Sequence, residues 1–298
     1  MKKQTNYTGP KRLAHRGLAQ AAPENTLGAF QGAVELGLEG MEIDVQLSRD
    51  GEIIVAHDFN FTRMTLGHPT APTNRRICEM TWEEIRSVEL PYANHTLSLE
   101  LPPHADIESM AIMPERLMGQ EPGSDYASAL SRDGRMAHLM RFADFDAWLS
   151  SRPEPITVEV EVKSPGIMKR MMEILDHSSN TARYILFSGV PAYTAEIQQM
   201  CRTMGKPCGL RLGANLRYLT EENRHVVETS DFFEIGLNAG CFSKDDVHWL
   251  ADRGVQVFSN LGDDPAWWEQ MCTLGVLGFK TNYAQAFTAW WNSSCFAE

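Results

Sequence analysis

The chain of 298 residues is 43% hydrophobic and 22% charged, with a formal net charge of -12. These proportions are typical of a globular protein with a substantial core and argue against intrinsic disorder. The acidic balance, without any run of Lys and Arg, excludes an extended nucleic-acid-binding surface, because phosphate backbones require clustered positive charge. No apolar stretch approaches the roughly 20 residues of a membrane span, and no secretory signal is expected at the start.

Six cysteines lie far apart and form neither a CxxC pair nor a dense framework. This spacing predicts buried, reduced thiols and therefore a cytoplasmic protein. The cysteines are Cys78, Cys201, Cys208, Cys241, Cys272 and Cys295.

The first predicted elements are a strand, a loop, a helix and a second strand. Residues 11–15 form a short apolar segment, and a Pro-containing loop separates it from the helical spacing of apolar residues over 26–36. Residues 41–47 then alternate apolar and polar side chains, which is strand periodicity. We therefore expect Glu42 and Asp44 on the polar face of this second strand.

A tight turn at Asp50-Gly51 leads into a further strand over 53–57. The turn is too short for the crossover that a parallel neighbour requires, so the arm that carries His57 should be antiparallel to the preceding strand. Beyond this arm the regular pattern is lost for many residues. We expect an insertion over approximately 87–138.

Helices and strands alternate again from residue 139 onward. Such alternation predicts parallel βα units, and eight strands remain when the antiparallel arm is set aside. Eight is the number of a closed barrel, so we predict a single TIM (β/α)8 domain over 1–298, with the insertion after the His57 arm. The later strands are expected over 156–162, 184–187, 209–212, 232–235, 255–258 and 277–280, and the later helices over 82–88, 139–149, 167–175, 193–204, 244–252, 265–272 and 284–291.

Carboxylates occur on neighbouring predicted strands, near the strand ends where barrel enzymes place their active sites. Glu42 and Asp44 lie on the second strand, and Glu159 and Glu161 share a face of the third. Such an oxygen-rich site favours Mg²⁺ or Ca²⁺ over zinc, for which cysteine ligands at zinc spacing are lacking. Glu159 could instead lie deeper in the barrel, paired with a basic side chain.

Basic side chains and imidazoles accompany these carboxylates. Arg16 offers a bidentate fork, and Lys163 a point charge, for the non-bridging oxygens of a phosphodiester. His15 and His57 suit general acid and base catalysis near neutral pH, and the sequence leaves open which does which. The other histidines lie outside any such cluster and are interpreted as surface or structural residues: His68, His95, His104, His138, His177, His225 and His248.

Short motifs follow one another along the chain: His15-Arg16-Gly17, Pro23-Glu24-Asn25-Thr26, Glu42-x-Asp44-Val45, Arg49-Asp50-Gly51, His57-Asp58 and Glu161-Val162-Lys163. In this order and spacing they resemble the glycerophosphodiester phosphodiesterase family, and together they are far more specific than any one of them. Two positions depart from the family pattern. Asn260 stands where many members carry a Trp, and the final strand ends in Thr281-Asn282-Tyr283-Ala284, where an Asp and a Pro are common.

The resemblance implies an enzyme that hydrolyses glycerophosphodiesters to glycerol 3-phosphate and an alcohol with a divalent metal, Mg²⁺ or Ca²⁺. The family spacing Glu-x-Lys selects Glu161 over Glu159 as a metal ligand. The expected partner is a small-molecule diester, and the oligomeric state, including a homo-oligomer, is left open. The implied roles are general acid and base for His15 and His57, metal ligation for Glu42, Asp44 and Glu161, and phosphate binding for Arg16 and Lys163.

Three other interpretations compete with this one. The same chemistry could act on a sugar phosphodiester or a lysophospholipid, because the two departing positions and the Met-rich insertion would form the walls around the alcohol groups. A non-catalytic binding protein on the same fold is disfavoured, because every matched position keeps a competent residue. A metal-dependent amidohydrolase-like barrel is disfavoured by the lack of a His-x-His pair and by the dominance of carboxylates.

Overall fold

The computed structural model describes residues 9–19, 22–65, 71–92, 136–260, 262–294 and 296. In this part of the chain, eight parallel strands close into a barrel, because β1 pairs with both β2 and β12. The prediction of a TIM barrel is therefore confirmed. The barrel strands are β1 (Lys11–His15), β2 (Gly40–Leu47), β7 (Thr157–Val162), β8 (Tyr184–Phe187), β9 (Arg211–Arg217), β10 (Glu234–Asn238), β11 (Gln256–Asn260) and β12 (Gly278–Thr281).

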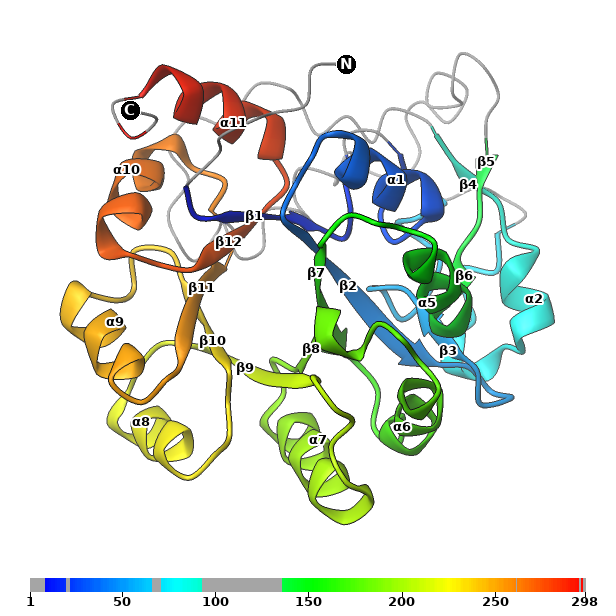
Figure 1. Cartoon of the computed structure of the whole chain (residues 1–298). Coiled ribbons are helices and arrows are strands. Elements are labelled where there is room, and N and C mark those ends of the chain that lie inside the picture. Colours follow the sequence, from blue (N-terminus) through cyan, green and yellow to red (C-terminus); the bar gives the residue numbers. More distant parts are fainter. Residues whose placement is uncertain are drawn as a thin grey trace.

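Helices surround these strands as an outer ring (Figure 1). Sequence periodicity predicted all of them except α8, whose sequence is largely polar and buries only Val227. The hydroxyl of Thr220 caps α8 by accepting the N–H of Asn223. The ring consists of α1 (Leu27–Glu35), α5 (Phe142–Ser150), α6 (Met168–Asp176), α7 (Pro191–Met204), α8 (Glu221–Glu228), α9 (Lys244–Ala251), α10 (Pro265–Leu274) and α11 (Ala284–Ser293).

The arm after β2 is antiparallel, as predicted from its short turn. β3 (Ile53–Val55) pairs with β2 and, on its other side, with β6 (Met140–Arg141), again antiparallel. The helix expected over 139–149 therefore starts only at α5, after β6.

A small second cluster of buried apolar side chains packs beside β3, on η1 (Ile77–Glu79) and α2 (Trp82–Arg86). Next to it, β4 (Leu90–Pro91) pairs with β5 (Met136–Ala137). The expected insertion starts and ends around this pair, and its residues 93–135 lie outside the described residues.

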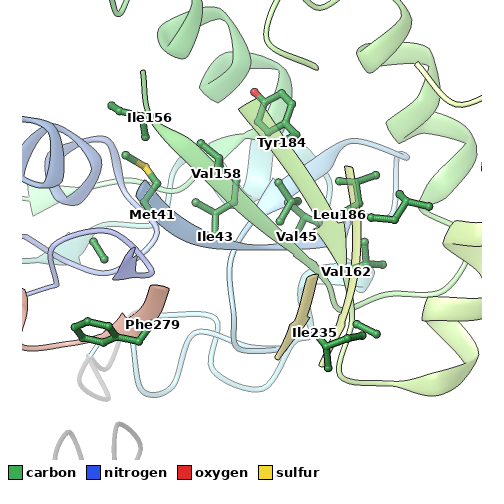
Figure 2. Close-up of a cluster of buried hydrophobic side chains, with 14 of the residues drawn as sticks. Met41, Ile43, Val45, Ile156, Val158, Val162, Tyr184, Leu186, Ile235 and Phe279 are labelled. Atoms are coloured by element: carbon green, nitrogen blue, oxygen red, sulfur yellow. The ribbon is translucent and has the colours of Figure 1, made fainter. Parts of the chain in front are cut away.

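Alternate side chains of the barrel strands point outward and pack against the helices. Figure 2 shows this cluster on β2, β7 and β8, with Met41, Ile43 and Val45 beside Val158 and Val162. All five of these side chains are almost fully buried. The residues between them on β2 and β7 therefore point into the barrel.

The barrel interior is polar below its mouth. Lys280 Nζ lies 2.5 Å from Glu159 Oε2, and both side chains are buried. Burial by itself lowers the pKa of Lys280, but Glu159, Glu42 and Glu234 raise it above its ordinary value, so the ammonium stays charged. Glu159 thus takes the deeper, paired position that was one of its two sequence interpretations.

Four described cysteines, Cys78, Cys201, Cys208 and Cys272, carry free thiols, of which those at Cys78 and Cys208 are exposed rather than buried as expected. Searched over the described residues, no helix has both the length and the apolar character that crossing a bilayer requires.

Candidate functional site

Three carboxylates lie together on β2 and β7. Parallel pairing places Asp44 beside Glu161, and one oxygen from each of Glu42, Asp44 and Glu161 lies within 4.8 Å of the other two. Burial, together with the charges of Asp44 and Glu161, raises the pKa of Glu42 well above its ordinary value. Asp44 Oδ1 is buried and accepts no hydrogen bond from the described residues. This surplus of negative charge fits a divalent cation with oxygen ligands.

Lys163 lies directly after β7 and contacts two of these carboxylates. Its Nζ is 2.9 Å from Glu161 Oε2 and 3.4 Å from Asp44 Oδ1. Burial by itself lowers the pKa of Lys163, but Glu161 and Asp44 raise it above its ordinary value, so this ammonium remains charged. The basic side chain expected from the sequence is therefore at the carboxylates.

Arg16 reaches the carboxylates because the chain turns sharply after β1. Arg16 has φ 61° and Gly17 has φ 78°, and a Cβ on Gly17 would lie 2.9 Å from the backbone of Ala29. This turn directs the Arg16 N–H to Glu42 Oε2 at 3.1 Å and its Nη1 to Glu24 Oε1 at 3.0 Å. A left-handed non-glycine residue is strained, and such residues cluster at functional sites.

The loop before α1 supplies two further buried residues to which sequence reasoning assigned no role in the site. Asn25, with φ 56°, donates from Nδ2 to Asp44 Oδ2 at 3.0 Å and accepts the Asp44 N–H at 3.3 Å. Glu24 holds the Arg16 guanidinium, as described above. Their place in a motif between two matched motifs was the available signal, because polar loop residues rarely become buried without partners.

His15 ends β1, and two residues that follow β11 and β12 fix its orientation through hydrogen bonds. Asp263 accepts both the backbone N–H of Asn282 at 2.9 Å and its Nδ2 at 2.7 Å. The Asn282 amide therefore turns its Oδ1 to His15 Nδ1, 2.9 Å away, so that Nδ1 carries the hydrogen. Burial, with the charge of Arg16, lowers the pKa of His15 to about 3. His15 is thus neutral, with its lone pair on Nε2.

His57 has a charged partner instead. Its Nδ1 donates to Asp58 Oδ1 at 2.8 Å, and Arg63 grips Asp58 from Nε at 2.7 Å and from Nη2 at 2.8 Å. Arg63 also donates to both oxygens of Glu24, each at 2.7 Å. A continuous set of charges therefore joins Arg16, through Glu24 and Arg63, to the partner of His57.

The structure brings His15, Arg16, Glu42, Asp44, Glu161 and Lys163 to one end of the barrel, and it brings His57 near them on the antiparallel arm. Burial opposes ionisation of Asp44, but Lys163, His57 and Arg16 lower its pKa below the ordinary value. Arg63 and Asp263 were not singled out in the sequence. Arg63 lies five residues after Asp58 in the same loop, which was the only local signal for it.

The chain is similar to known proteins in sequence and in fold. Residues 15–286 match the model of the glycerophosphoryl diester phosphodiesterase family. Glycerophosphodiester phosphodiesterase 1 of Rattus norvegicus is 39% identical over 90 residues, which are 30% of this chain and 25% of the rat protein. A glycerophosphodiester phosphodiesterase of Caldanaerobacter subterraneus is 42% identical over 77 residues, 26% of this chain and 29% of that protein. The matches thus span under a third of these curated relatives.

A solved structure resembles the whole chain. The phosphodiesterase of Oleispira antarctica, in complex with the product sn-glycerol-3-phosphate, superposes with a TM-score of 0.67 at 16% identity, over 94% of this chain and 96% of that one. At this identity the likeness shows a shared fold. The family match, by contrast, extends from the first histidine of the site to the last helix. The chain belongs to the glycerophosphoryl diester phosphodiesterase family.

Proposed function

We propose that this chain is an enzyme that hydrolyses glycerophosphodiesters to glycerol 3-phosphate and an alcohol, with a divalent metal and two histidines. One observation carries the proposal: three clustered carboxylates lie beside the cationic side chains of Arg16 and Lys163 at the same end of the barrel as two histidines. One histidine is hydrogen-bonded to a neutral amide and the other to a carboxylate. Family membership and the product named for the Oleispira antarctica structure support the same reaction.

Glu42, Asp44 and Glu161 are the residues that would hold the metal. Their oxygens suit Mg²⁺ or Ca²⁺, which prefer carboxylate ligands. When bound, such a cation supplies electrostatic stabilisation of the negative charge that develops on a phosphoryl group. Arg16 and Lys163 would bind the non-bridging oxygens of the diester, because both are charged and border the same carboxylates.

The two histidines would divide the proton transfers. His15, neutral beside the uncharged Asn282, accepts the proton of the attacking water on Nε2. His57, whose Nδ1 donates to the carboxylate of Asp58, acts as the general acid and gives a proton to the oxygen of the leaving alcohol. The phosphorus–oxygen bond to that alcohol breaks as the bond to water forms, so glycerol 3-phosphate and the free alcohol are released.

A diester panel tests the proposal. Glycerophosphocholine, glycerophosphoethanolamine and glycerophosphoglycerol are incubated with the protein before and after chelation, and then with Mg²⁺, Ca²⁺ or Zn²⁺ added back. We expect glycerol 3-phosphate to appear, to be lost with chelator and to return with Mg²⁺ or Ca²⁺. No turnover of any of the three diesters with either metal would contradict the proposal, and activity that only zinc restores would contradict the metal assignment.

Two other expectations stay predictions: the cytoplasmic location, which rests on the dispersed cysteines, and the oligomeric state.

A further inference from the structure

Three asparagines lie on the strands across the barrel from the carboxylates: Asn238 and Asn260 end β10 and β11, and Asn215 lies near the end of β9. Parallel pairing places Asn238 beside Asn260 and Asn215 beside Gly236. On these strands, residues of the opposite alternation pack outward in the main core, so the asparagines point into the barrel mouth. These outward residues are Ala214, Ile235, Leu237 and Val257.

The three carboxamides contact one another but are incompletely paired. Asn260 Nδ2 donates to Asn215 Oδ1 at 2.8 Å and to Asn238 Oδ1 at 3.3 Å. Asn260 Oδ1 is buried without a partner, and among the described residues the NH₂ groups of Asn215 and Asn238 have no acceptor. The buried Asn260 Oδ1 is the atom whose missing partner calls for an explanation, and the two unused NH₂ groups beside it are available to a ligand with oxygen acceptors.

Asn215, Asn238 and Asn260 are called the carboxamide trio below. Two glycines leave open space beside this trio. Neither Gly189 nor Gly236 has a positive φ, so the backbone does not require glycine at these positions. A Cβ on Gly236 would lie 3.0 Å from Asn260 Oδ1, and a Cβ on Gly189 would lie 3.4 Å from Glu161 Oε1 and 3.8 Å from Asn215 Nδ2. The space above Gly189 therefore borders both the carboxylates and the trio.

The chemistry of the trio restricts what it can recognise. Carboxamides are uncharged and both donate and accept hydrogen bonds, which matches hydroxyl groups. A quaternary ammonium instead needs aromatic faces or negative charge, and the trio has neither.

We propose that Asn215, Asn238 and Asn260 form a site for a neutral group with adjacent hydroxyls, carried by the substrate on one side of its phosphate. The inference rests on the proposed function, because the phosphate must lie at the carboxylates. Two groups have this chemistry, the glycerol that stays on the phosphate and a polyol that leaves, and the experiment separates them.

Binding is measured first, by calorimetry on the Mg²⁺-loaded protein with glycerol 3-phosphate and with propyl phosphate, which lacks the hydroxyls. We expect the wild type to prefer glycerol 3-phosphate by on the order of 10-fold, the size of one or two hydrogen bonds. Asn215→Leu and Asn238→Leu should each reduce this preference several-fold. Asn292→Leu, at an exposed position of α11, is the matched control and should keep it.

Turnover then locates the hydroxyls. In the variants, a fall in kcat/KM for both glycerophosphocholine and glycerophosphoglycerol, relative to bis(4-nitrophenyl) phosphate, places the retained glycerol at the trio. A relative fall for glycerophosphoglycerol alone places the leaving polyol there. Melting temperatures of all variants confirm folding.

Some results overturn the inference. One is an equal affinity of the wild type for glycerol 3-phosphate and propyl phosphate. Another is a preference for glycerol 3-phosphate that persists in both Asn215→Leu and Asn238→Leu. If the wild type cleaved no glycerophosphodiester but still preferred glycerol 3-phosphate through Asn215 and Asn238, the proposed reaction would fail and the hydroxyl site would stand.

Discussion

Charged side chains crowd the barrel mouth on β1, β2 and β7, whereas neutral carboxamides lie at or near the ends of β9, β10 and β11. In the charged half each group has at least one ionic or hydrogen-bonded neighbour. Removing one buried charge would therefore leave the opposite charge of its partner unpaired. In the carboxamide half a lost contact costs only a neutral hydrogen bond. The difference suggests that the first half determines the reaction, while the second can change with the substrate.

The largest expected effects concern the histidines. His15→Gln and His57→Gln should each lower kcat by about 10² to 10⁴, because each removes one proton transfer. With a 4-nitrophenyl leaving group, which needs no protonation, the defect of His57→Gln should shrink while that of His15→Gln persists. A defect that shrinks for His15→Gln instead would reverse the assigned roles. His248→Gln, on the outer helix α9, is the control.

The carboxylates should come next. Asp44→Asn keeps the shape of the side chain but removes one negative charge from the metal site, so we expect kcat/KM to fall about 10³-fold. Calorimetric titration with Mg²⁺ should show much weaker binding. Glu173→Gln, in an exposed ion pair on α6, should change neither quantity. Unaltered Mg²⁺ affinity in Asp44→Asn would mean that the metal is held elsewhere.

Arg63 should act through position rather than through contact with the substrate. Arg63→Lys cannot reproduce the paired hydrogen bonds to Asp58 and Glu24, so His57 should lose its fixed orientation. We expect kcat to fall by about 10- to 100-fold with KM and Mg²⁺ affinity little changed. Nitrogen NMR should show His57 in mixed tautomers, and Arg170→Lys provides a surface control. A loss of Mg²⁺ affinity would place Arg63 in the metal site instead.

Acid should weaken the metal-free protein through His15. Its pKa is about 3 in the fold and 6.5 in the unfolded chain, so the unfolded state binds the extra proton between these values. The free energy of unfolding should therefore fall as the pH drops from about 6.5 toward 3, by at most about 1.4 kcal/mol per pH unit from this group. Urea titrations should give a smaller pH slope for His15→Gln, and equal slopes would show that His15 titrates normally.

The smallest effect is expected in the carboxamide half. Gly236→Ala would place a Cβ 3.0 Å from Asn260 Oδ1 without changing any polar group. The preference for glycerol 3-phosphate over propyl phosphate should fall by about 3-fold, less than for loss of a hydrogen-bonding side chain. Gly254→Ala has open space around it but a positive φ of 74°, and it should cost stability while leaving this preference intact.

Sequence periodicity predicted the barrel strands because their outward residues alternate regularly. It placed β9 too early, over 209–212, because the mouth end of that strand is polar and its pairing with β10 shifts register after Gly236. It missed α8 because that helix buries little, and β6 because its two residues precede a strong helical pattern.

The residues proposed for catalysis could be chosen from motifs, but their supports could not. Asn282 accepts a hydrogen bond from a histidine 267 positions earlier, and only barrel closure reveals that contact. The positioning role proposed for Arg63 depends on its ion pairs with both Glu24 and Asp58, which only the folded structure reveals. The roles assigned to the site residues remain predictions that the variants above test.

The seam between β1 and β12, where the two ends of the sheet pair, also carries the contact that orients His15. The metal carboxylates lie on β2 and β7, which pair with each other independently of this seam. His15, in contrast, takes its orientation from Asn282 on the far side of it. A barrel that opened transiently between β1 and β12 would therefore keep the proposed cation site and lose the fixed orientation of the proposed base, His15. Turnover, compared with metal occupancy on the same sample, would then report the fraction of molecules in which the barrel is closed.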